Sequence, residues 1–203
     1  MHRSKSILVA AVLLAPGCGD STAPEAEAVP ESQLEFVRFP ADLQPLVTRQ
    51  GSVWAVKGES SELVLRYQAE PGEDEGEEFL EFDIPGNALL RRPDGTLFQR
   101  GDSVLITVTV DDGGRFLFHF EPSGLVFDPD HAPELEITYR RVGGDLNGDG
   151  TVDDDDDDLE DRMSLWRQER PGLPWFRIGT VKFEDLDEVE AEIFSFTGFA
   201  IAA

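Results

Sequence analysis

The chain has 203 residues, of which 42 are acidic and 17 basic, for a net charge of −25 at pH 7. That length allows one medium domain with a real core, and a hydrophobic fraction of 40% with 14 phenylalanines excludes a wholly disordered chain. The charge argues against nucleic acid or anionic lipid headgroups as partners, because both are bound through clusters of Lys and Arg. It favours cations instead.

The N-terminal segment has the pattern of an export signal. Arg3 and Lys5 precede an apolar run over residues 7–15. This run is shorter than the roughly 20 residues that span a bilayer, but it suits a signal peptide. Cys18, the only cysteine, follows closely and resembles the lipid-carrying residue of a bacterial lipoprotein. Ala15 stands where such signals usually have Leu, so an ordinary signal peptide with an incidental Cys18 is the alternative.

These features predict the organisation of the chain. We expect a signal peptide over residues 1–17, lipidation at Cys18, a flexible tether over residues 18–33 and one domain over residues 34–203. The tether is rich in Ser, Thr, Ala, Pro and Glu and has almost no large apolar residue, so it cannot form a packed core. Gly19 after the cysteine is compatible with an outer-membrane lipoprotein of the bacterial cell envelope.

The body of the chain alternates apolar and polar residues with a period of two, which is typical of half-buried strands. The apolar positions, which we expect to face inward, are Leu63, Leu65 and Tyr67; Leu80, Phe82 and Ile84; Val104, Ile106, Val108 and Val110; Phe116, Phe118 and Phe120; Leu135, Ile137 and Tyr139; and Val189, Ala191 and Ile193. Phe79 falls on the opposite face. Asp112, Gly113 and Gly114 predict a hairpin between two of these strands. Short strands with frequent turns predict an all-β fold, an antiparallel β-sandwich.

Several segments resemble the ZU-five domain, a β-sandwich found in ankyrins and related proteins. They are residues 82–89 (FDIPGNAL), 120–127 (FEPSGLVF), 133–139 (PELEITY) and 194–200 (FSFTGFA). The resemblance covers about residues 75–203 and implies a module for protein contacts without catalysis. Some members of that family cut themselves at a His-Phe-Ser site. Here Ile193 replaces the His, so Ser195 has no adjacent general base and self-cleavage is not expected.

Residues 145–156 (DLNGDGTVDDDD) match the twelve-residue EF-hand calcium loop and also resemble the loop of dockerins. Gly150 occupies the position of the sharp turn, and Val152 is expected to pack the loop inward. Calcium takes six to eight hard oxygen ligands. The predicted ligands are the side chains of Asp145, Asn147, Asp149, Asp153 and Asp156 and the backbone carbonyl of Thr151.

Two features of this insertion leave alternatives open. Six consecutive aspartates run from Asp153 to Asp158, so Asp157 or Asp158 could close the site in place of Asp156. A helix is expected from Asp153 to Trp166, because acidic residues suit a helix N-terminus, although the repulsion among them opposes it. A solvated acidic loop without calcium is the alternative. Dockerins have two such loops, so pairing with a cohesin is not expected of this single one.

No enzymatic motif occurs in the sequence: there is no nucleophile elbow, no HExxH and no phosphate-binding loop. His119 and His131 are expected on the surface. The acidic stretch over residues 70–78 is expected to be a solvated hairpin tip. Three tryptophans could form a sugar-stacking platform, although core or rim positions are commoner for this residue type: Trp54, Trp166 and Trp175.

The sequence therefore predicts a non-enzymatic, lipid-anchored envelope protein. Its β-sandwich would bind a protein or glycan partner, and one calcium loop would stabilise it. The alternative is a carbohydrate-binding β-sandwich involved in polysaccharide use.

Overall fold

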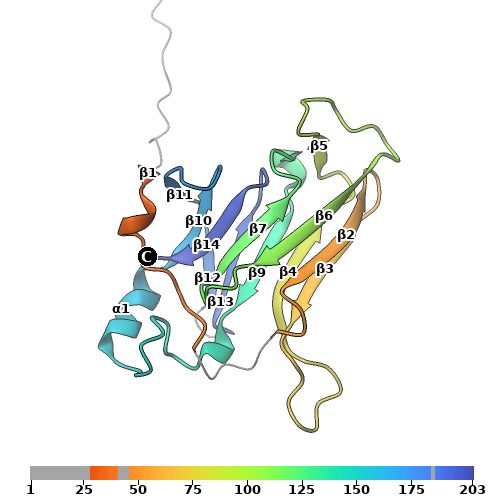
Figure 1. Ribbon diagram of the computed structural model, residues 1–203. Helices are drawn as coiled ribbons and strands as arrows, with labels where there is room; N and C mark the ends of the chain where they lie inside the picture. Colours follow the sequence, from red (N-terminus) through yellow and green to blue (C-terminus); the bar gives the residue numbers. More distant parts are fainter. Residues whose placement is uncertain (1–27, 41–45, 184–185) are drawn as a thin grey trace, which may run out of the picture.

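The computed structural model describes residues 28–40, 46–183 and 186–203 (Figure 1). The predicted signal peptide and Cys18 lie outside these ranges, as does most of the predicted tether. The elements in chain order are β1 (Ala28–Val29), η1 (Glu31–Gln33), β2 (Gln50–Val56), β3 (Ser61–Arg66), β4 (Glu78–Ile84), β5 (Leu89–Arg91), β6 (Ser103–Val110), β7 (Leu117–Glu121), β8 (Val126–Phe127), η2 (Pro129–His131), β9 (Glu134–Thr138), η3 (Arg140–Val142), α1 (Asp154–Arg162), β10 (Ser164–Gln168), β11 (Trp175–Arg177), β12 (Val181–Phe183), β13 (Glu188–Glu192) and β14 (Gly198–Ala202).

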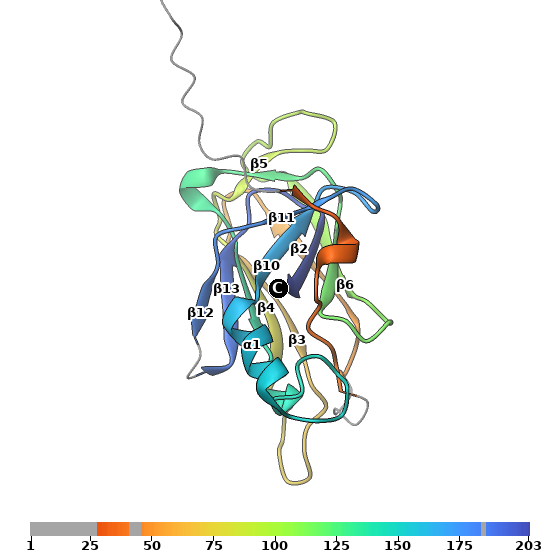
Figure 2. The ribbon, with the colours of Figure 1, turned by 90° about the vertical axis from the view of Figure 1, so that its left-hand side faces the viewer.

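These strands form two antiparallel sheets that pack face to face (Figures 1 and 2). The larger sheet has the order β1-β11-β10-β14-β7-β6-β2, and the smaller has the order β12-β13-β9-β4-β3. A short ladder of β5 and β8 forms a third sheet. The all-β, sandwich-like fold predicted from the alternation is confirmed. No helix in the described ranges is long and apolar enough to cross a membrane.

The core between the sheets is built mainly from phenylalanine. Phe82 of the smaller sheet contacts Phe120 of the larger at 5.3 Å between ring centroids, and Phe196 lies within 5.6 Å of both rings. The predicted inner positions of β7 and β9 are buried, as are those of β6 except Val104, which is partly buried against the core. The hairpin at residues 112–114 also forms, because β6 and β7 pair antiparallel on either side of it.

Phe79 departs from the predicted alternation. It was assigned to the outward face of its strand, yet both Phe79 and Leu80 are buried. The pairing of β3 with β4 shifts register between Leu65 and Arg66, where the partner changes from Leu80 to Glu78. Such an irregularity lets consecutive residues point to the same side. Phe79 thereby packs against Phe118 at 5.9 Å between centroids.

Strand pairing with the domain begins at Ala28, before the predicted domain start at residue 34. Residues 28–33 were assigned to the tether, but Ala28 and Val29 pair with β11. Val29 packs against a small second core on the outer face of the larger sheet, which includes Trp166 and Trp175. Glu31 adds an ion pair with Arg115 at 3.0 Å. This segment therefore packs on apolar surface of the domain, although its polar composition predicted a flexible tether.

The acidic hairpin tip between β3 and β4 is tied to the body. It was predicted to be solvated, but the Arg141 guanidinium lies 3.1 Å from Glu70, 3.6 Å from Glu73 and 2.8 Å from Glu77. Only 11% of the Arg141 side chain is exposed. One cation therefore balances part of the charge of this tip.

Candidate functional site

The calcium-type loop lies in the connection from β9 to β10, between η3 and α1. It is at the end of the sandwich opposite β1 (Figures 1 and 2). Leu146, its second residue, is buried in the main core. The backbone N–H of Arg38 donates to the carbonyl oxygen of Leu146 at 2.8 Å. The loop is therefore fixed to the body at its start.

The loop turns as the spacing predicts. Gly150 has φ of +91°, a conformation that residues with a Cβ rarely adopt. Asp145 accepts hydrogen bonds from the backbone N–H groups of Asp149 and Gly150, both at 3.1 Å. The hydroxyl and backbone N–H of Thr151 donate to Asp149, which lowers the pKa of that carboxyl. The carboxylates at loop positions 1 and 5 are thus each held by hydrogen bonds from groups of the turn.

Asp156 links the two ends of the loop through hydrogen bonds to its backbone. Its Oδ1 accepts from the N–H groups of Leu146 at 2.8 Å and Asn147 at 3.1 Å, and its Oδ2 accepts from the N–H of Asp153 at 3.1 Å. Asp156 is 2% exposed, whereas Asp157 and Asp158 are exposed. Of the three aspartates that the sequence left open, Asp156 is the one that faces the loop.

Asp153 and Asp156 also begin the helix. They form a capping box in which each side chain accepts a hydrogen bond from the other residue's backbone, and acidic residues in the first turn are favourable at a helix N-terminus. The helix ends at Arg162, earlier than predicted, because Met163 is extended and Ser164 begins β10. Trp166 therefore lies in a strand.

One expectation about this loop is not met. Val152 was predicted to pack inward but is 65% exposed. No three carboxylates of the loop have oxygens within 4.8 Å of one another. In the described part of the chain, the one trio of carboxylates with oxygens all within 4.8 Å of one another lies elsewhere, at Glu62, Glu81 and Asp83. The loop thus has the turn and the oxygen-bearing side chains of an EF-hand type loop, arranged more openly than the trio.

That trio belongs to a larger acidic face, the outer surface of the smaller sheet. Its carboxylates come from β3, β4, β9 and β13, and the sheet register places them in cross-strand rows. One row is Glu62, Asp83, Glu134 and Glu192, and the next is Glu81, Glu136 and Glu190. Like charges directly opposite each other destabilise a sheet. Positive charge placed against this face would therefore relieve repulsion among its carboxylates.

The titration of two central glutamates reflects this crowding. Burial, a hydrogen bond with Glu78 and the charges of Glu78, Asp83 and Glu62 raise the pKa of Glu81 to about 7. Burial and the neighbouring Glu188 raise the pKa of Glu136 to about 7 as well. Each carboxyl consequently holds a proton at a pH where an isolated glutamate is ionised.

Sequence reasoning did not find this face, although it placed several of its residues on outward positions. Alternation along one strand shows which residues face out, but not which residue of a distant strand stands opposite. Glu81 and Glu136 are paired by the register of β4 with β9. The excess of acidic residues at outward positions was the available signal.

The remaining candidate residues are separate from these sites. Trp166 and Trp175 are buried, at 9% and 1% exposure, so they cannot form a sugar-stacking platform with Trp54, which is 62% exposed. His119 and His131 are exposed, as expected. Cys18 lies outside the described residues.

Comparisons of the chain with protein-family models, with curated proteins and with solved structures found no match in any of the three.

Proposed function

We propose that the chain is a non-enzymatic, lipid-anchored protein of the bacterial cell envelope, a β-sandwich interaction module with a structural calcium loop. The acidic face carries the interaction part of this proposal. In each of its two rows, carboxylates of neighbouring strands stand directly opposite one another, at a cost to the stability of the sheet. A cationic partner would remove that repulsion and would be attracted to the face during association.

The anchor would be Cys18, with export through the preceding signal peptide and an outer-membrane destination. Ala28 follows Cys18 by ten residues, which span at most about 35 Å when fully extended. The calcium-type loop lies at the end of the sandwich opposite β1 (Figure 1). An anchored molecule would therefore present this loop away from the membrane.

Calcium would be held by Asp145, Asn147, Asp149, Asp153, Asp156 and the carbonyl of Thr151. The donors fit, since all are hard oxygens and Gly150 makes the required turn. The ion would offset the repulsion among the aspartates that follow the turn. Isolated extracellular loops of this kind bind calcium with a Kd of about 10⁻⁴ to 10⁻³ M.

Thermal unfolding tests the calcium proposal. Binding to the folded state alone stabilises it by roughly 2.7 kcal/mol at a hundredfold excess of calcium over Kd. Asp149→Ala should abolish this gain, while Asp157→Ala, an equal loss of charge at an exposed helix position, should retain it. Magnesium at equal ionic strength should stabilise less, because it demands a tighter octahedral site. Identical melting of the two variants in calcium would reject a specific site.

Membrane fractionation tests the anchor. The wild-type protein should partition into detergent or membranes after export, and Cys18→Ser should release it. A wild-type protein found wholly in the aqueous phase would reject the lipoprotein assignment.

Carbohydrate binding is the second candidate, favoured by one observation. Trp54 is 62% exposed and stands opposite Leu105, which is 42% exposed, on the outer face of the larger sheet. Exposed aromatic rings are the groups that stack on sugars. A glycan array that shows binding lost in Trp54→Ala would favour this function, whereas an array without binding would reject it.

A further inference from the structure

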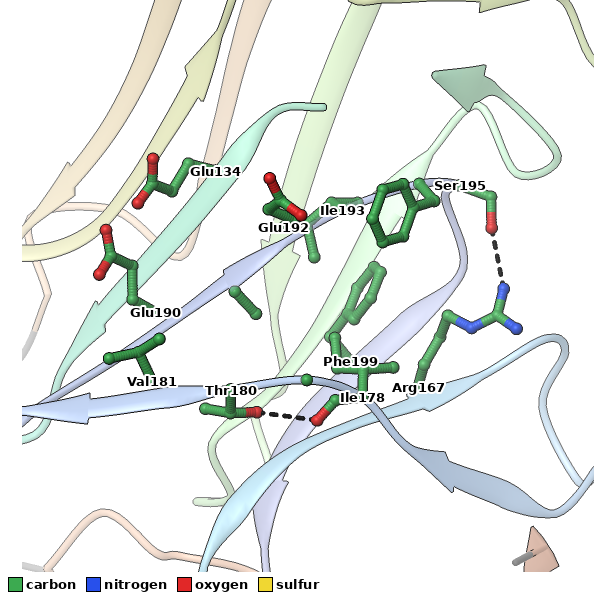
Figure 3. Close-up of a pocket in the computed structure, with 13 residues that line it drawn as sticks. Glu134, Arg167, Ile178, Thr180, Val181, Glu190, Glu192, Ile193, Ser195 and Phe199 are labelled. Atoms are coloured by element: carbon green, nitrogen blue, oxygen red, sulfur yellow. Dashed lines mark hydrogen bonds between the residues drawn. The ribbon is translucent and has the colours of Figure 1, made fainter. Parts of the chain in front are cut away.

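A cleft of about 700 Å³ opens at one edge of the sandwich, beside β12 (Figure 3). The pairing of β12 with β13 ends at Val181 and Glu190. On one side of the cleft, residues 178–180 cross from β11 of the larger sheet to β12 of the smaller. On the other side, the chain continues from β13 through Ile193 to Ser195. The cleft lies between these two diverging segments.

The floor of the cleft is apolar. Ile193 and Phe199 are each 1% exposed and belong to the main core, and Ile178 packs against that core. Two further apolar side chains line the cleft while remaining open to solvent, namely Val181 at 54% and Phe194 at 49% exposure. An apolar group of a ligand would therefore contact apolar side chains both at the buried floor and at the exposed rim of the cleft.

The charges of the lining are separated. Glu134, Glu190 and Glu192 gather on one side, while Arg167 lies on the other (Figure 3). Arg167 donates a hydrogen bond to the Ser195 hydroxyl at 2.8 Å and lies 3.7 Å from Glu169. The three glutamates belong to the two acidic rows, so the cleft forms the border of the acidic face.

We propose that this cleft binds a short basic segment of a partner protein. An aliphatic or aromatic side chain of the segment would enter over Ile178, Ile193 and Phe199. Neighbouring Lys or Arg side chains would lie against Glu134, Glu190 and Glu192. The inference rests on the proposed interaction function and names the partner chemistry, which is a peptide that places positive charge next to an apolar residue.

Size and charge favour this occupant over others. Ligand cavities usually have volumes of roughly 300–1,000 Å³, so about 700 Å³ accommodates a few side chains and not a folded domain. Three carboxylates at the rim disfavour anionic ligands, which like charges repel. A purely apolar ligand would leave the glutamates without a partner, and a purely polar one would leave the floor of the cleft uncovered.

Fluorescence anisotropy with three short peptides, blocked at both ends, tests the proposal. The peptide KLKFK has both required features, KSKSK keeps the charge without the apolar residues, and ELEFE keeps the apolar residues but reverses the charge. KLKFK should bind the wild-type protein at least about tenfold more tightly than the other two. Its affinity should fall as salt is raised, because exposed charge pairs are screened within about 8–10 Å at physiological ionic strength.

Matched variants locate the binding. Glu192→Gln and Val181→Ser change exposed residues at the cleft. Glu192→Gln should weaken KLKFK binding by about two- to fivefold, the range of an exposed ion pair. Val181→Ser should weaken it by a similar factor, because it removes apolar surface that the peptide would cover. The controls are Glu62→Gln, at the far end of the same acidic row, and Leu97→Ser, whose exposure of 55% matches that of Val181. Both controls should bind as the wild type does.

Each other result would overturn the cleft assignment. Equal binding of KSKSK and KLKFK would mean that the acidic face attracts cations in general, and equal losses in Glu62→Gln and Glu192→Gln would mean the same. The absence of binding by KLKFK, in a protein that is still stabilised by calcium and retained in membranes, would reject the cleft and leave the anchored calcium-binding module standing.

Discussion

Glu81 is the residue whose substitution tests the acidic face most directly. It lies on β4, opposite Glu136, and burial raises its pKa to about 7 with the help of Glu78, Asp83 and Glu62. An unfolded glutamate titrates near 4.5. The folded state therefore binds more protons than the unfolded state between these two values, and stability must fall as the pH rises from about 4.5 to about 7.

The size of this loss follows from the same values. Each pH unit between them contributes about 1.4 kcal/mol, so the full effect would be roughly 3 kcal/mol. Glu81 is partly exposed, and solvent screening reduces this to about 1 kcal/mol. Glu81→Gln keeps the shape of the protonated side chain and cannot ionise. It should stabilise the protein by about 1 kcal/mol at pH 8, which raises Tm by about 2–4 °C for a chain of this size.

Thermal unfolding at pH 5 and pH 8 measures the effect. At pH 5 the folded wild type already holds the proton, so Glu81→Gln should change Tm little. Glu121→Gln is the control, because it removes the same charge from an exposed strand position whose partner is the uncharged Thr107. Equal gains from both variants would attribute the effect to net charge. A loss of stability in Glu81→Gln at pH 8 would refute the reasoning.

Three further predictions concern the core, the tryptophans and the loop. Phe118→Ala should destabilise the fold by about 3–5 kcal/mol in denaturant unfolding, whereas Thr107→Ala on the outer face should cost about 1 kcal/mol or less. Trp175→Ala should likewise cost about 3–5 kcal/mol, and Trp54→Ala should change stability by no more than about 0.5 kcal/mol. Gly150→Ala should cost about 1–2 kcal/mol and weaken the calcium response, because its φ of +91° strains any residue with a Cβ.

The inner face of the sandwich could be predicted because alternation is a local property. Ile106 and Val108 face the core simply because successive residues of a strand point to opposite sides. Phe79 could not be placed by that rule. Its orientation depends on a register shift between β3 and β4, and a shift of one residue reverses the facing of everything beyond it.

The start of the folded body shows a different limit. The composition around Val29 is that of a linker, and no periodicity marks it as a strand. The segment is ordered by Trp175, which lies far along the chain on β11 and presents apolar surface for Val29 to cover. Tertiary burial decided the structure here against the local signal.

The calcium-type loop and the cleft also differ in whether their residues are neighbours in the sequence. The calcium-type loop draws its donors from twelve consecutive residues, so their spacing alone predicts the turn at Gly150 and the inward carboxylate of Asp156. The cleft takes its lining from five strands and two connections, and residues as far apart as Glu134 and Phe199 meet there. No local pattern contains that arrangement, because it depends on how two sheets diverge at an edge. The acidic rows at the border of the cleft depend in addition on strand register. Register decides whether the carboxylates of one strand stay isolated or stand opposite those of the next, where a cationic partner would be attracted to them.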